Sequence, residues 1–216
     1  STNNSSTANL AALTSLTLAQ DHRGLLDDIS IYSRALGAAE VQSLANRETY
    51  LTSGGGWGTP SNWNTGAAPA GDNVFVGGGN TATVSGNEVA SSVTVGHNGL
   101  TAVGNGTLNI NSGNLNVTGD VNLGQGGTSG DINVTGNALT VGGNINSAGS
   151  NSINGGTVSA PASGDQQMRI DSASGNLAIG SNLNLQKSGL VVSGAGNTTI
   201  SGDISGTATL NGPLSG

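Results

Sequence analysis

The chain has 216 residues, a formal net charge of −7, 8% charged residues, 38 glycines and no cysteine. Five Lys and Arg residues cannot form the positive patch that nucleic-acid binding needs, and a chain without cysteine has neither disulfides nor thiolate metal sites. No apolar run approaches the roughly 18 residues of a membrane span. We therefore expect no nucleic-acid partner and no membrane insertion.

The first segment, residues 1–50, has a conventional composition. Residues 16–19 and 28–32 are predicted to form short strands. Residues 33–46 are predicted to be helical because Leu36, Val41 and Leu44 fall on one helical face.

Part of this segment resembles the last strand and following helix of laminin-G-like, concanavalin-A-type jelly-roll domains of bacterial surface proteins. The matching residues are Gly24, Asp27, Asp28, Ile29, Ile31, Tyr32, Arg34, Ala35, Leu36, Glu40 and Val41. The resemblance implies that residues 1–50 are the remnant of such a domain. A lone strand leaves unpaired backbone groups, so Ile29, Ile31 and Tyr32 are a candidate assembly strand for pairing with another chain.

Residues 51–80 contain both tryptophans and are predicted to form a cap module. Trp57, Asn62, Trp63, Pro69, Asp72 and Val74 follow a pattern that resembles the start of autotransporter-type bacterial β-helix repeats. The end of a solenoid needs a bulky apolar cover, which Trp57 and Trp63 can supply. The alternative is that the two indoles are a platform for glycan stacking.

An internal repeat follows. When residues 107–130 are aligned with residues 131–154, an offset of 24 residues, apolar positions coincide. The coinciding pairs are Leu108 with Ile132, Ile110 with Val134, Leu115 with Leu139, Val117 with Val141, and Val121 with Ile145. Each repeat holds three short segments that alternate apolar and polar residues, as strands do.

The repeat predicts an all-β fold, a parallel β-helix (β-solenoid) of about 24 residues and three short strands per coil, with about six coils between residues 74 and 210. Glycine and asparagine between the strands are expected to take positive φ angles at sharp corners. Outward Asn and Thr side chains are expected to form hydrogen-bonded ladders from coil to coil. We assign the solenoid to residues 81–216, with an irregular loop near 155–174 in which Gln166, Gln167 and Arg169 form a candidate recognition loop.

The residues that carry chemistry are few and scattered. His22 and His97 lie far apart, and His97 is expected in a solvated corner. The acidic residues are dispersed, and the segment 126–132 only approximates a calcium-binding nonapeptide. We expect no enzyme activity, and no catalytic, cofactor-binding or metal-binding residues.

These patterns favour a structural β-solenoid that associates with itself end to end into a fibre, stalk or matrix. The family resemblances imply an extracellular or cell-surface location. The runner-up is an adhesin or glycan-binding surface module, whose partner would be a polysaccharide or another matrix protein. A polysaccharide-active enzyme and an ice-binding protein rank below both.

Overall fold

The computed structural model describes residues 48–98, 103–162 and 167–206. The chain divides into two compact units, Ser1–Ala45 and Asn46–Gly216, and all described residues belong to the second. The strands and the helix expected within residues 1–47, and the assembly residues Ile29, Ile31 and Tyr32, lie outside the described residues.

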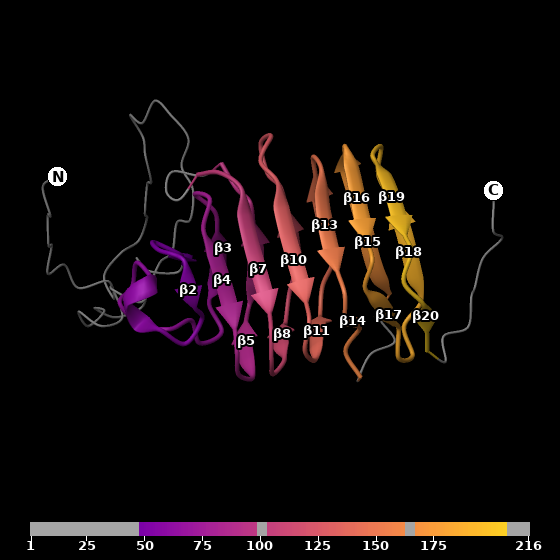
Figure 1. Cartoon of the computed structure of the whole chain (residues 1–216). Coiled ribbons are helices and arrows are strands. Elements are labelled where there is room, and N and C mark those ends of the chain that lie inside the picture. Colours follow the sequence, from indigo (N-terminus) through magenta and orange to yellow (C-terminus); the bar gives the residue numbers. More distant parts are fainter. Residues whose placement is uncertain (1–47, 99–102, 163–166, 207–216) are drawn as a thin grey trace, which may run out of the picture. The chain divides into compact units, whose positions relative to one another are not determined.

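The second unit is a parallel β-solenoid whose strands form three sheets (Figure 1). Sheet 1 consists, in spatial order, of β1 (Glu48–Tyr50), β3 (Asn73–Val76), β6 (Ser92–Val95), β9 (Val121–Leu123), β12 (Ile145–Ala148), β15 (Met168–Ser174) and β18 (Leu190–Ser193). Sheet 2 consists of β2 (Gly55–Gly56), β4 (Thr81–Val84), β7 (Gly106–Ile110), β10 (Gly130–Val134), β13 (Asn151–Asn154), β16 (Asn176–Ile179) and β19 (Asn197–Ile200). Sheet 3 consists of β5 (Glu88–Ala90), β8 (Leu115–Val117), β11 (Ala138–Val141), β14 (Thr157–Ser159), β17 (Asn182–Asn184) and β20 (Ile204–Ser205).

This arrangement confirms the predicted fold class. From β3 onward, each strand pairs in parallel with the strand three places later in the chain, which gives about six coils of three strands. The five apolar pairs that coincide in the sequence alignment are all strand partners in the structure. The 24-residue offset is therefore the length of one physical coil.

The core is a set of columns of buried aliphatic side chains that run along the solenoid. In sheet 1, one inward column is fully buried and consists of Val74, Val93, Val121, Ile145 and Ile170. The other two sheets contribute similar columns, for example Leu115, Leu139, Val158 and Leu183 in sheet 3. Because alternate strand residues face opposite sides, the polar residue between two buried ones points outward.

Coil length varies outside the aligned repeats. Val93 pairs with Val121, 28 residues later, whereas Asn133 and Asn154 are joined by a hydrogen bond across 21 residues. The corners absorb the difference, and the strands stay in register apart from one irregularity between β12 and β15 at Ser147 and Ala148. β1 and β3, which precede residue 81, already belong to sheet 1, and β14 and β15 lie within the stretch 155–174 that we expected to be an irregular loop.

The corners use glycine and asparagine for different purposes. Gly113, between β7 and β8, has φ 78°, a left-handed conformation that glycine adopts without a steric cost. No described asparagine has a positive φ, so the expectation that asparagine would share this role is wrong. Asparagine instead ties successive corners together: Asn87 Oδ1 accepts the backbone N–H of Asn114 at 3.0 Å, and Asn114 Oδ1 accepts that of Ala138 at 3.1 Å.

The outward faces carry amide ladders, as predicted. Asn133 Nδ2 donates to Asn109 Oδ1 at 2.9 Å in sheet 2, and Asn146 Nδ2 donates to Asn122 Oδ1 at 2.9 Å in sheet 1. Each ladder joins side chains from neighbouring coils and adds to the backbone hydrogen bonds between them.

Replacing Asn133 with alanine should lower the free energy of unfolding by about 1 kcal/mol, because Asn133 both donates to Asn109 and accepts from Asn154. Asn116 is the matched control, since it also points outward from a strand but makes no side-chain hydrogen bond among the described residues. The Asn116→Ala variant should stay within about 0.5 kcal/mol of wild type in denaturant unfolding. Equal losses in the two variants would show that the ladder contributes no stability.

Candidate functional site

The two tryptophans form a buried pair in the first described coil. Trp57 has no exposed surface and Trp63 is 3% exposed. The rings meet edge to face with their centroids 5.3 Å apart, and Trp63 Nε1 donates to the carbonyl oxygen of Trp57 at 2.7 Å. Stacking on a sugar needs an exposed ring face, and neither indole offers one. This burial is what the predicted cap requires.

The buried pair predicts a specific fluorescence behaviour. Emission from both tryptophans should be shifted to short wavelength, and acrylamide should quench it only weakly until the chain unfolds. Soluble glycans should leave the spectrum unchanged, because no ligand can reach the rings. Strong quenching in the native chain would contradict the buried arrangement.

The candidate recognition loop is only partly described. Gln166 lies outside the described residues, and Gln167 is exposed and directly precedes β15. Arg169 lies within strand β15 and not in a loop. Its side chain is 49% exposed, and Nη2 lies 3.5 Å from Asp171 Oδ2 on the same strand. The guanidinium is therefore part of the outer face of sheet 1.

His97 is buried, so the expectation of a solvated corner is wrong. It is 4% exposed, and its ring centroid lies 5.2 Å from that of Phe75. An antiparallel bridge between His97 and Gly104 shows that the chain doubles back here. His22 lies outside the described residues.

The last described coil leaves core positions uncovered. Val192 pairs with the fully buried Ile170 but is 47% exposed, and Ile204 pairs with the fully buried Leu183 but is 52% exposed. In the described part of the chain, β18, β19 and β20 each have a partner strand on one side only. This surface, which we call the C-terminal coil edge, combines apolar side chains with unpaired strand backbone.

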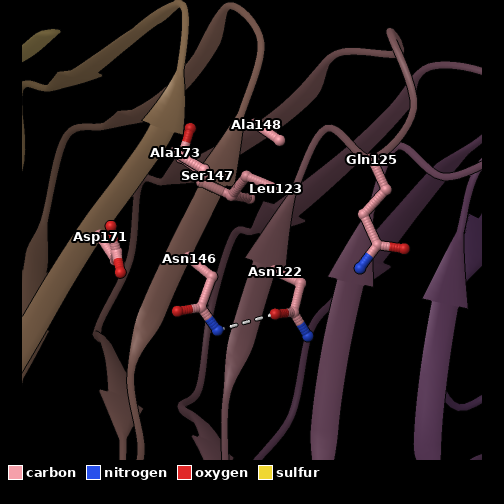
Figure 2. Close-up of a pocket in the computed structure, with 8 residues that line it drawn as sticks. All are labelled: Asn122, Leu123, Gln125, Asn146, Ser147, Ala148, Asp171 and Ala173. Atoms are coloured by element: carbon pink, nitrogen blue, oxygen red, sulfur yellow. Dashed lines mark hydrogen bonds between the residues drawn. The ribbon is translucent and has the colours of Figure 1, made fainter. Parts of the chain in front are cut away.

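A shallow pocket of about 190 Å³ lies on the outer face of sheet 1 (Figure 2). Its lining comes from three successive coils: Asn122, Leu123, Gln125, Asn146, Ser147, Ala148, Asp171 and Ala173. Asn122, Asn146 and Asp171 occupy one outward column, because Asn122 pairs with Asn146 and Asn146 with Asp171. The sequence alone did not predict this pocket. A signal was present in the outward polar position that the aligned repeats share, Asn122 and Asn146.

Within the described ranges, no group of three or more His, Cys, Asp or Glu side chains is placed to hold a metal ion. No helix in that part of the chain is long and apolar enough to cross a membrane. Comparisons with models of protein families, with curated proteins and with solved structures gave no match. The resemblances to laminin-G-like domains and to autotransporter-type repeats therefore stay hypotheses.

Proposed function

We propose that the chain is a structural, extracellular or cell-surface β-solenoid that associates with itself end to end into a fibre, stalk or matrix. The observation that carries the proposal is the C-terminal coil edge, where Val192 and Ile204 occupy core columns and yet are half exposed. Stacking a further coil there would continue both columns.

The backbone supports the same conclusion. An unpaired strand edge is a template for pairing with another chain, and within the described residues three sheets each end on such an edge in the last coil. Contact between unlike ends of two copies repeats without closing and gives a filament. The terminal surface therefore offers both the apolar area and the backbone hydrogen bonds that such a contact needs.

The outer faces of the solenoid also support a structural role, because side-chain hydrogen bonds join successive coils. Amide ladders such as Asn109 with Asn133, and corner hydrogen bonds such as Asn87 with Asn114, join each coil to the next. The extracellular location rests on the resemblance of residues 24–48 and 54–78 to segments of bacterial surface proteins.

Sedimentation velocity across a dilution series tests the proposal. Wild-type chain should move from monomer to progressively larger species as the concentration rises, because end-to-end contact has no natural limit. A single monomeric species at every concentration would overturn self-association. A dimer that grows no further would overturn the fibre.

A glycan-binding surface module is the second candidate. The buried tryptophans do not favour it, but the pocket on sheet 1 does. This pocket is independent of the C-terminal coil edge, and the two functions are compatible in one chain.

A further inference from the structure

The pocket on sheet 1 has a definite structural cause. Ala148 and Ala173, on β12 and β15, put short side chains beside the outward column of Asn122, Asn146 and Asp171. Larger side chains at these two positions would fill the space. Figure 2 shows the amide–amide pair on the floor, Asp171 on one side and Gln125 on the other. The volume of about 190 Å³ leaves room for one small ring.

In the row of amides at the base of the pocket, each side chain donates its hydrogen bond toward the preceding coil. The acceptor oxygen of the last amide in the row is therefore left without a donor from this row. Asn146 Nδ2 donates to Asn122 Oδ1, and Asn122 Nδ2 donates to Thr94 Oγ1 at 3.5 Å. Asn146 Oδ1 therefore faces away from Asn122, toward the strand that carries Asp171 (Figure 2). The carboxylate of Asp171 is also an acceptor and cannot donate to this oxygen. Both residues are partly exposed, so water or a ligand with hydrogen-bond donors can satisfy these two acceptors.

The charges at the pocket favour a neutral ligand. Asp171 is the only ionisable residue among the lining residues, and the guanidinium of Arg169 lies 3.5 Å from its carboxylate. The amides of Asn122, Asn146 and Gln125 carry no charge. Because the whole chain has a net charge of −7, a polyanion would be repelled.

We infer that this pocket binds one pyranose ring of a neutral glycan. Two neighbouring hydroxyls of the ring donate to Asn146 Oδ1 and to the carboxylate of Asp171, one coil apart. The C–H groups of the ring pack against Ala148 and Ala173, and the Gln125 amide at the rim bonds a further hydroxyl.

A single pocket of this kind should bind a sugar with low affinity. It is small and open and its lining has no aromatic ring, so we expect a dissociation constant on the order of millimolar. If the chain forms the proposed fibre, pockets repeat along it and raise the avidity for a polysaccharide. Binding of one ring does not depend on that assembly, so the two proposals fail separately.

The test is a titration of the ¹⁵N-labelled full chain, kept dilute, with D-glucose, D-galactose, D-mannose and N-acetylglucosamine, each alone. Side-chain amide signals of Asn122, Asn146 and Gln125 should shift and saturate in the millimolar range with at least one sugar. The signals of Asn109 and Asn133 are the internal control, because they form the same kind of ladder on sheet 2 and line no part of this pocket.

Two matched variants complete the experiment. Ala173→Leu fills the pocket from an exposed position and should weaken binding at least tenfold. Ala178→Leu makes the same change at an exposed position of β16 on sheet 2 and should leave binding unchanged. Absence of saturable shifts with all four sugars, equal shifts at Asn109 and Asn133, or wild-type binding by Ala173→Leu would each overturn the inference.

Discussion

Replacing Gly130 with alanine is expected to lower the free energy of unfolding by about 3 kcal/mol. Gly130 starts β10, and it is buried against the coil before it. An added Cβ would overlap the carbonyl oxygen of Val95 and lie 2.7 Å from its carbonyl carbon. These are backbone atoms of sheet 1, which cannot move aside as a flexible side chain can. The backbone N–H of Gly130 also donates to the buried Asn151 Oδ1 at 2.7 Å, so a shift of β10 would disturb that bond too.

Gly180 provides the matched control. A Cβ there would meet nothing closer than 3.6 Å, and its φ lies outside the left-handed region. The Gly180→Ala variant should be as stable as wild type, or more stable by about 0.4–1 kcal/mol because alanine restricts the unfolded chain. Denaturant unfolding followed by circular dichroism measures both variants. Wild-type stability in Gly130→Ala would show that the coils are not packed as closely as described.

The double variant Val192→Lys with Ile204→Lys should weaken self-association at least about 100-fold. About half of the surface of each side chain is still exposed, and burying it on association should contribute about 2–3 kcal/mol of binding free energy for the pair. A change of 1.4 kcal/mol in binding free energy is a tenfold change in affinity. Burying two lysine charges in the contact adds a further penalty. The change in association, measured by sedimentation, should occur without loss of the folded state because both positions are already exposed.

The control for this experiment is Asn116→Lys with Ala178→Lys, which adds the same charge at two exposed positions. Asn116 lies on β8 and Ala178 on β16, and each of these strands has a partner strand on both sides, so neither position lies at an end of the solenoid. This variant should associate as wild type does. If the two double variants lose association equally, net charge is the cause and not the coil edge.

The sequence predicted the fold from a simple physical regularity. Stacked coils must place residues of similar character above one another, so partners such as Leu108 with Ile132 recur at a fixed offset. The same regularity gives wrong predictions at some positions, because the sequence pattern assigns every polar residue of a strand to the outer face. Asn151 is 5% exposed and lies inside, where its amide bonds Ser147 Oγ at 2.8 Å and backbone groups.

The candidate sites were harder to predict than the fold. The sequence singled out the tryptophan pair as either a cap or a glycan platform, and only the structure shows that the rings are buried. The pocket on sheet 1 depends on small side chains from β12 and β15 meeting beside one amide column. Ala148 and Ala173 are separated by an irregular register between these strands, so no fixed offset in the sequence joins them.

The central claim is that copies of this solenoid join through the C-terminal coil edge. Negative-stain electron microscopy of the wild-type chain across a dilution series tests it most directly, with light scattering on the same samples. We predict unbranched fibres, one solenoid in width, that lengthen as the concentration rises. Isolated particles of constant size at every concentration would contradict the account.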